Sequence, residues 1–311
     1  MSKQSKSNRP TRQNNPTLWF VVGGGVLVSM VGVWFALSGP QISNGNTRAI
    51  SQLHTRDFHS LVFSSSEPDT IFFGHHDGLL VSRNGGKDWQ PTTLLSADAM
   101  ALAAPLTNPH VMYAAGHNVF LKTTDDGQSW QSVATNLPGL DIHGFTANPE
   151  NADELYAHVV GFGIFGTQDG GTTWTQLSTT APPSTYNLAM GEHSQMLYAA
   201  AGKAGLWRSQ DGGQTWAKVS GFPDEGAIAI AFVPADKRLL VAGNVAGLYA
   251  SNDGGKTWTS TGVNGRILAI APPAHMTRIA YLPLATKGEF LPVGIMAAHG
   301  RINKTRSAPS H

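Results

Sequence analysis

One eight-residue motif recurs through most of the chain, and its spacing constrains the fold more than any other feature. The last copy, Ser-Asn-Asp-Gly-Gly-Lys-Thr-Trp, runs from Ser251 to Trp258. Four earlier copies begin at Ser82, Thr123, Thr167 and Ser209, so successive copies start 41, 44, 42 and 42 residues apart. A near-constant period of this length indicates a repeat architecture in which each unit is one small supersecondary element.

Each copy has the chemistry of a tight turn. The third position is Asp, or Asn in the first copy, and its side chain can accept hydrogen bonds from backbone N–H groups ahead of it. The fifth position is always Gly, which tolerates a positive φ, and the eighth is always Trp, which is large enough to wedge between packed sheets. The expected structural residues are Asn84, Asp125, Asp169, Asp211 and Asp253 at the third position, and Trp89, Trp130, Trp174, Trp216 and Trp258 at the eighth.

The pattern Ser/Thr-x-Asp-x-Gly-x-Thr/Ser-Trp resembles the Asp-box, or BNR repeat, of β-propellers such as sialidases, sortilin-type receptors and the photosystem II assembly factor of the BNR class. The resemblance covers residues 50–303. It implies that each box occupies the turn between the third and outermost strands of a blade, on the face away from the usual binding site. The boxes are therefore interpreted as folding devices.

Short β-type runs broken by turn residues divide the chain after residue 50 into six units. Five units contain a box, and the sixth, which starts at Arg266, has none. We predict an all-β fold, a six-bladed β-propeller over residues 50–303, followed by a disordered tail over residues 304–311. A strand near Ile50–His54 is predicted to complete the sixth blade, because the outer edge of that sheet would otherwise be exposed.

The N-terminal segment predicts a membrane anchor. Residues 1–17 contain four basic residues and no acidic one, and residues 18–37 form an uncharged run of twenty residues. As a helix, such a run spans a hydrocarbon core of about 30 Å. The basic flank predicts a cytoplasmic tail over residues 1–17, a transmembrane signal-anchor over 18–37, a linker over 38–49 and a propeller on the extracytoplasmic side of the cytoplasmic membrane. A signal sequence cleaved near Ala36-Leu37-Ser38 is the alternative, and it would also export the propeller.

Histidines recur at two registers of the first three units. Counting back 23 or 24 residues from a box gives His59, Met100 and His143, at the start of the innermost strand. Counting back six residues gives His76 and His117, in the turn between the second and third strands on the same face. We predict that these five residues form a ligand-binding site at one mouth of the central channel.

The residue types at this mouth suit a metal ion or a small polar ligand. Imidazole with thioether favours copper, and imidazole with carboxylate favours zinc. The chain has no Cys, so thiolate sites and disulfides are excluded. The alternative interpretation is that these histidines bind no ligand and are either solvated or hydrogen-bonded to neighbouring backbone.

A glycoside hydrolase acting on extracellular glycans is the second function class, because Asp-box propellers include sialidases. Two carboxylates facing a cleft would be needed, and Asp57 and Asp141, each two residues before a histidine of the set, are the candidates. The sialidase resemblance also implies an arginine triad and a Tyr–Glu pair. Arg is sparse here, and no Phe/Tyr-Arg-Ile-Pro stretch precedes the first unit. The sequence therefore favours a binding protein over an enzyme.

Charge gives no basis for nucleic-acid binding, since the formal net charge is +1 and only 13% of residues are charged. The sequence predicts a membrane-anchored propeller that binds a metal ion, a small polar ligand or a partner protein through a His-rich face. The resemblance to the photosystem II assembly factor implies a scaffold or assembly role, although the arginine-rich patch of that factor has no obvious counterpart in this chain.

Overall fold

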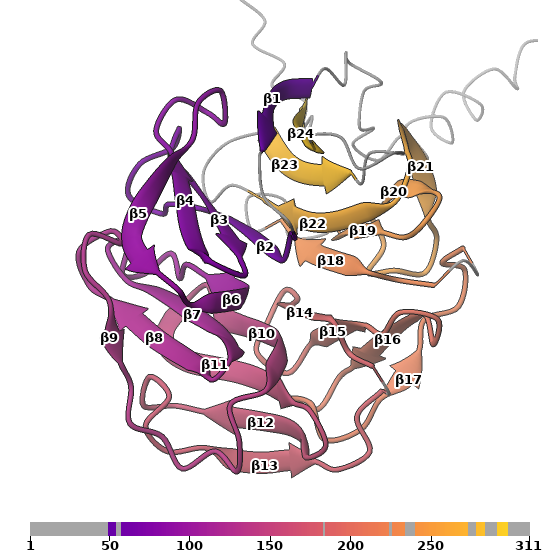
Figure 1. Ribbon diagram of the computed structural model, residues 1–311. Helices are drawn as coiled ribbons and strands as arrows, with labels where there is room; N and C mark the ends of the chain where they lie inside the picture. The colour runs from indigo at the N-terminus through magenta and orange to yellow at the C-terminus, as the bar shows by residue number, and fades with distance from the viewer. Residues whose placement is uncertain are drawn as a thin grey trace, which may run out of the picture. The chain divides into compact units, whose positions relative to one another are not determined.

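Six four-stranded antiparallel sheets follow one another around a central axis in the computed structural model (Figure 1). The structure describes residues 49–53, 57–182, 184–223, 226–233, 240–272, 278–283 and 291–297. The predicted membrane segment 18–37 and the tail 304–311 lie outside these ranges. Among the residues that are described, no helix combines the length and the apolar character that a membrane crossing requires. The predicted six-bladed, all-β propeller is confirmed.

The first five blades are built from strands that are consecutive in the sequence, with the first strand of each blade at the axis. The first blade contains β2 (Ser60–Phe63), β3 (Ile71–His75), β4 (Gly78–Ser82) and β5 (Gln90–Leu95), and the second contains β6 (Asp98–Ala103), β7 (Met112–His117), β8 (Val119–Thr123) and β9 (Gln131–Ser132). The third contains β10 (Ile142–Asn148), β11 (Asn151–Val159), β12 (Gly163–Thr167) and β13 (Thr175–Ser178), and the fourth contains β14 (Asn187–Met190), β15 (Leu197–Ala200), β16 (Leu206–Ser209) and β17 (Ala217–Lys218). The fifth contains β18 (Ala229–Phe232), β19 (Leu240–Gly243), β20 (Gly247–Ser251) and β21 (Thr259–Asn264).

The sixth blade joins the two ends of the propeller. Its order is β22 (Ile267–Ala271), β23 (Arg278–Pro283), β24 (Leu291–Ala297) and then β1 (Ala49–Leu53). Strand β1 pairs antiparallel to β24, with Ala49 opposite Gly294 and Leu53 opposite Leu291. The predicted closing strand is therefore confirmed, and it covers the sheet edge that β24 would otherwise expose.

The core lies between neighbouring blades. The largest cluster joins the second and third blades, where the Phe120 ring stacks at 6.3 Å from Tyr113 and meets Trp174 edge to face at 5.8 Å. Such aromatic contacts add to the hydrophobic burial of the rings. Trp174 closes an Asp-box, which confirms that a box Trp can fill the space between blades.

The boxes form the expected turns between the third and outermost strands. In the third blade the Thr167 hydroxyl donates to Asp169 Oδ1 at 2.7 Å and accepts the Gly171 N–H at 3.3 Å, while Asp169 Oδ1 accepts the Thr173 N–H at 2.8 Å. The fifth-position glycines all have positive φ, between 76° and 94°. In four boxes the Trp indole N–H donates to the carbonyl of that glycine; these are Trp89, Trp174, Trp216 and Trp258. The indole nitrogen of Trp130 has no such partner among the described residues.

Two faces of the ring follow from this arrangement. We call the face with the boxes the box face, and the opposite one, with the turns between second and third strands, the His face. His110 lies on the box face, where its Nδ1 is 2.6 Å from Asp126 Oδ2.

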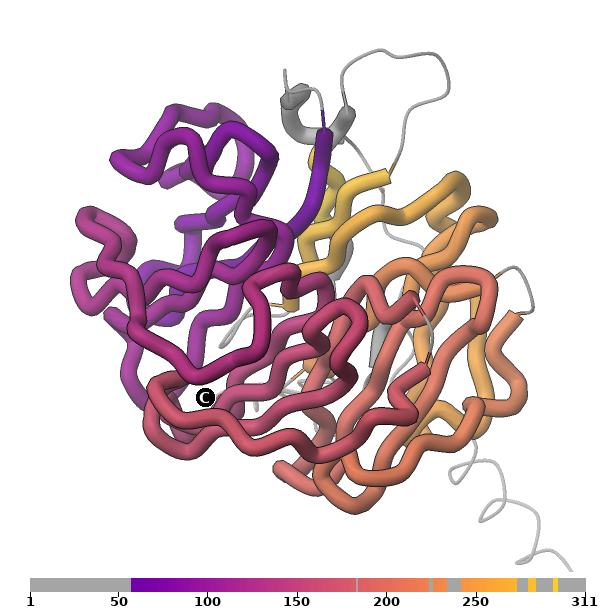
Figure 2. Tube along the Cα trace, turned by 60° about the horizontal axis from the view of Figure 1, so that its bottom comes forward, coloured from indigo at the N-terminus to yellow at the C-terminus, as the bar shows by residue number. Residues whose placement is uncertain are grey.

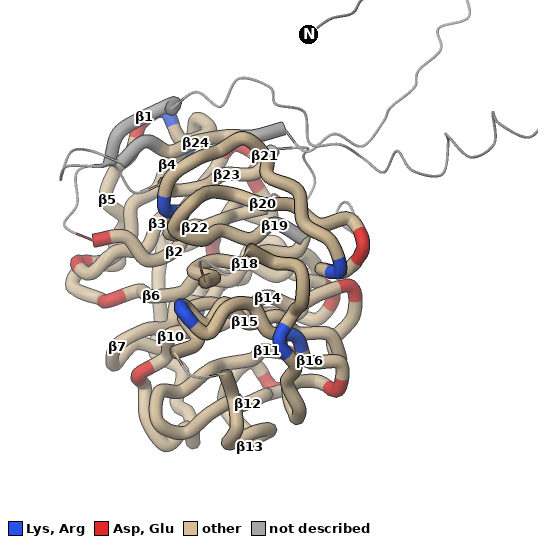
Figure 3. Tube along the Cα trace, turned by 90° about the vertical axis from the view of Figure 1, so that its right-hand side faces the viewer, with Lys and Arg blue, Asp and Glu red and all other residues tan. Residues whose placement is uncertain are grey.

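Seen 60° from the first view, the trace runs back and forth between the two faces (Figure 2). Charged residues are few, and they lie mainly in the loops (Figure 3).

Candidate functional site

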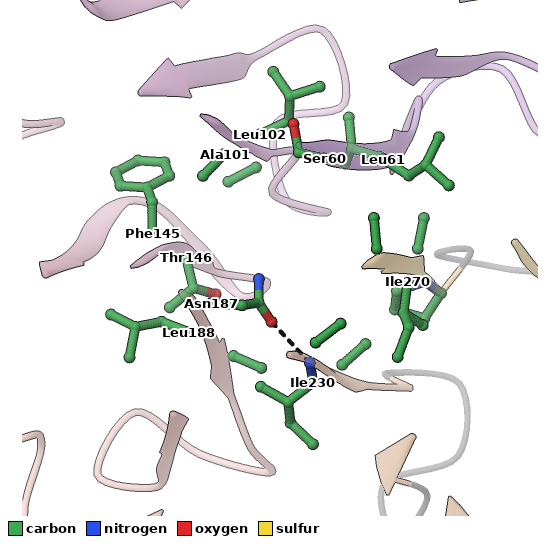
Figure 4. A pocket seen from close by; sticks show the side chains of 18 of the residues that line it. Ser60, Leu61, Ala101, Leu102, Phe145, Thr146, Asn187, Leu188, Ile230 and Ile270 are labelled. Carbon is green, nitrogen blue, oxygen red and sulfur yellow. Dashed lines mark hydrogen bonds between the residues drawn. The ribbon is translucent and has the colours of Figure 1, made fainter. Parts of the chain in front are cut away.

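A central cavity of about 430 Å³ runs between the innermost strands of all six blades. Its wall combines apolar and polar groups, and Leu61, Phe145 and Ile230 are among the apolar side chains that line it (Figure 4). One polar group of the wall serves the ring itself: the Asn187 side chain accepts the backbone N–H of Ile230 at 2.9 Å, which ties β14 to β18.

Polar chemistry is concentrated at the His-face mouth of this cavity, over the first three blades. Seven side chains gather there from the beginnings of innermost strands and from turns between second and third strands: Asp57, His59, His76, Asp98, His117, Asp141 and His143. We call this set the imidazole cluster. It forms because each blade places its second-to-third turn beside the innermost strand of the next.

Asp98, the first residue of β6, is the centre of the imidazole cluster. It is only 9% exposed, yet three imidazoles surround it. Its Oδ2 lies 2.5 Å from His117 Nδ1 and 3.0 Å from His76 Nδ1, and its Oδ1 lies 3.3 Å from His59 Nε2. His59 Nε2 and Asp98 Oδ1 are nevertheless both buried without a well-formed hydrogen bond among the described residues.

Three atoms of His117, His143 and Asp141 form a tight triangle. His117 Nε2 lies 3.1 Å from His143 Nε2 and 3.3 Å from Asp141 Oδ1, and His143 Nε2 lies 3.0 Å from the same oxygen. All three side chains have solvent access, since Asp141 is half exposed and His143 is a quarter exposed.

A second group, Asp57, His59 and His76, lies on the other side of Asp98. Asp57 Oδ2 is 3.5 Å from His59 Nε2 and 3.4 Å from His76 Nδ1, and Asp57 Oδ1 accepts the backbone N–H of His76. Burial lowers the pKa of His59, although Asp57 and Asp98 oppose this effect. The carboxylates therefore partly offset the penalty of a charged imidazole at this position.

His158 is buried in β11, the second strand of the third blade. Desolvation lowers the pKa of its imidazole to about 4, with a smaller contribution from nearby His143. Its Nδ1 has no hydrogen-bond partner among the described residues, so this nitrogen is packed rather than hydrogen-bonded.

The structure brings together four of the five ligand residues predicted from the sequence: His59, His76, His117 and His143. The fifth, Met100, lies further along β6 and lines the central cavity. The two carboxylates considered for hydrolysis, Asp57 and Asp141, lie at the same mouth, where each contacts two imidazoles.

Sequence reasoning missed the role of Asp98. Asp98 stands two residues before Met100, as Asp57 and Asp141 stand two residues before His59 and His143, but it was not selected. The repeat spacing could have identified Asp98, because it places this residue at the start of the innermost strand of the second blade, next to the His-bearing turn of the first blade.

The His face also presents an apolar surface that was not predicted. A pocket of about 400 Å³ lies beside His143, lined by Val160 and Phe162 of one turn, and by residues 179–182 and 184–186, including Tyr186. The five exposed large hydrophobic residues among those described all lie on this face, near second-to-third turns: Leu95, Val160, Phe162, Tyr186 and Val245. Val160, Phe162 and Tyr186 share the pocket, and a contiguous apolar patch of this kind marks an interaction surface.

The repeats, the six blades and the box geometry together define the class: the chain is an Asp-box, or BNR-repeat, β-propeller. Residues 47–193, just under half of the chain, match the family model described as the photosynthesis system II assembly factor YCF48. No curated protein sequence matches the chain.

Solved propellers share the fold at low sequence identity. A structure of YCF48 bound to a D1 peptide is 18% identical, with a TM-score of 0.54, and the match covers 84% of this chain and 100% of that one. The structure of U3-55K is 12% identical, with a TM-score of 0.55 over 78% and 79% of the two chains. The GH74 enzyme of Niastella koreensis is 15% identical, with a TM-score of 0.53 over 77% of this chain; the chain spans only 36% of that enzyme.

Proposed function

We propose that this protein is a membrane-anchored, extracytoplasmic propeller that binds a polypeptide segment of a partner protein on its His face, in a scaffold or assembly role. The observation that carries the proposal is that three of the exposed large hydrophobic residues on that face, Val160, Phe162 and Tyr186, together line one pocket. The likeness to the assembly factor YCF48, one structure of which holds a D1 peptide, supports a polypeptide as the ligand.

The chemistry of the pocket indicates what kind of segment it would accept. Val160, Phe162 and Tyr186 offer apolar surface for one aliphatic or aromatic side chain, and desolvated anchors of this kind dominate binding energies. The half-exposed carboxylate of Asp141 lies next to His143, which lines the same pocket. A segment that presents an exposed apolar side chain therefore complements this surface.

Photocrosslinking in the cells that make the protein tests this proposal. The photoreactive residue p-benzoyl-phenylalanine replaces Phe162 on the His face or, as the matched control, exposed Thr172 on the box face. We expect a crosslinked partner polypeptide from position 162 only, and loss of that crosslink when Tyr186→Ser is added. Equal crosslinking from both positions, or none from position 162, would contradict the proposal.

The location of the propeller can be tested independently, because the chain contains no Cys. A single Lys256→Cys substitution on the exposed part of the last box should react with a membrane-impermeant maleimide in intact cells. A Ser2→Cys substitution should react only after lysis, since the basic N-terminus is expected in the cytoplasm. Protection of both positions would contradict an extracytoplasmic propeller.

No observation in the site favours the hydrolase alternative. Asp57 and Asp141, its candidate residues, are each held by two imidazoles rather than aimed together at an open cleft. The likeness to GH74 enzymes shows the shared fold alone.

A further inference from the structure

The triangle of His117, Asp141 and His143 has the dimensions of a metal site. Its three edges, between two imidazole nitrogens and one carboxylate oxygen, measure 3.1, 3.3 and 3.0 Å. Ligand atoms of a tetrahedral zinc ion, each about 2.0–2.1 Å from the metal, are about 3.3 Å apart. We propose that His117, Asp141 and His143 bind one divalent metal ion of the zinc class. This site adjoins the polypeptide-binding pocket, which His143 also lines, but the proposal rests on the geometry of the triangle and not on the proposed function.

When both imidazoles are neutral and Asp141 is ionised, the triangle contains more lone pairs than protons. His117 Nδ1 lies 2.5 Å from the buried carboxylate of Asp98, so a neutral His117 donates its one N–H there. Its Nε2 then offers a lone pair to a neighbour that is also an acceptor, Asp141 Oδ1 at 3.3 Å. In this state only the N–H of His143 can supply a proton to the triangle. A cation between the three atoms removes the repulsion between their lone pairs.

Asp98 gives this site the outer support that metal-binding histidines typically have. A ligating imidazole usually donates its other N–H to a carboxylate, which fixes the tautomer and the ring orientation. Asp98 takes this part toward His117, and its burial at 9% exposure keeps its position fixed. Asp98 is therefore a positioning residue, not a ligand.

The donor set selects the class of metal. Two imidazoles and one carboxylate form a site of borderline and hard donors, which suits zinc; copper sites with thioether ligands would need Met100, which lines the central cavity instead. Three protein ligands leave a coordination position open for water or for a ligand side chain. Within the described residues, every ion-pair partner of Asp98 and Asp141 is a histidine, so no lysine or arginine competes with the ion.

The neighbouring group of Asp57, His59 and His76 serves as an internal comparison. Its ligand atoms also lie within 4.8 Å of one another, but its measured edges of 3.4 and 3.5 Å are longer. His59 is also more buried than the imidazoles of the triangle, with 18% of its side chain exposed against 42% for His117. The triangle is the more accessible and more compact of the two groups.

Metal titration of the full-length chain, purified in detergent without a polyhistidine tag and stripped with a chelator, tests the assignment. We expect one tightly bound Zn²⁺ per chain by calorimetry, and a visible d–d spectrum of a nitrogen- and oxygen-ligated ion when Co²⁺ is used. His117→Ala and His143→Ala should abolish both signals. Asp98→Asn should retain the ion with affinity weakened about 10- to 100-fold.

Two controls keep the location of the ion falsifiable. His110→Ala removes an imidazole from the box face, where it contacts Asp126, and should leave binding unchanged. His76→Ala tests the neighbouring group. An ion that survives His143→Ala but is lost in His76→Ala would overturn the assignment, as would the absence of saturable binding in a chain whose circular dichroism shows it to be folded.

Discussion

The Nε2 atoms of His117 and His143 lie 3.1 Å apart although the two residues belong to different blades and are 26 positions apart in the sequence. The contact arises because the turn that ends β7 lies beside the start of β10. The imidazole cluster is therefore a product of the ring: residues at two registers of the repeat converge only once consecutive blades are packed.

Asp98 should contribute to stability more than the other carboxylates of the imidazole cluster. Asp98→Ala removes a buried acceptor from three imidazoles, and a buried polar group left unsatisfied costs about 1–3 kcal/mol. Asp141→Ala, at a half-exposed position, should change the free energy of unfolding by less than about 0.5 kcal/mol. Urea unfolding of the two variants measures the difference, and similar losses would contradict the central role of Asp98.

Loss of the buried hydroxyl at the first position of an Asp-box should destabilise the protein more than loss of the exposed hydroxyl at the seventh position. Ser251 is buried, donates to Asp253 Oδ1 and accepts the Gly255 N–H at 2.8 Å. Ser251→Ala should lower the free energy of unfolding by about 1–3 kcal/mol, because the buried Gly255 N–H loses its acceptor. Thr257→Ala in the same box removes an exposed hydroxyl and should cost much less. Equal effects in thermal unfolding would argue against this hydrogen-bond pattern as the source of stability.

The box carboxylates should make the fold sensitive to acid in a defined range. Hydrogen bonds from the backbone and side chains of the turn lower the pKa of Asp125 and Asp211 to about 2. A depressed folded-state pKa contributes stability that is complete above the unfolded value, near 4, and is lost as pH falls toward 2. Thermal midpoints measured across this range should fall less steeply in Asp211→Asn. They should fall more steeply in Asn84→Asp, which introduces a carboxylate into the first box; no change in either slope would contradict the mechanism.

His158 predicts a second pH effect, at milder acidity. Its imidazole has a pKa of about 4 in the folded protein because burial disfavours the charged form. The unfolded chain, with a value near 6.5, binds more protons between these limits, so stability should decline as pH falls from about 6.5 to 4. His158→Phe should flatten this part of the stability profile, whereas His193→Ala, at an exposed position, should not. An unchanged profile in His158→Phe would show that His158 does not titrate on unfolding.

The fold could be predicted from the sequence because the boxes repeat both their chemistry and their spacing. Asp169 and Gly171, for example, specify their turn locally, and the same turn five times over leaves little choice of architecture. The faces of the ring follow from the same register, which is why His59 and His143 were placed at one mouth.

The details of the site depend on contacts between blades, which no local pattern encodes. The position of Asp98 among three imidazoles requires the relative placement of the first two blades and of the turn after β7. Met100 shares its register with His59, but it lies within an irregularity in the pairing of β6 with β7, between Asp98 and Ala101, and lines the cavity. The apolar pocket likewise combines a turn of the third blade with the segment that enters the fourth.

Closure by β1 should be the feature on which the integrity of the whole ring depends. Strand β1 supplies the outermost strand of the sixth blade, with four residue pairs to β24. A chain that begins at residue 57 lacks these pairs, and at about 0.5–1.5 kcal/mol per backbone hydrogen bond it should lose about 2–5 kcal/mol relative to a chain that begins at residue 40. The exposed edge of β24 should also promote self-association, which sedimentation would detect. A synthetic peptide of residues 47–55 should restore the stability of the shorter chain, and a shorter chain as stable and monomeric as the longer one would show that β1 is dispensable.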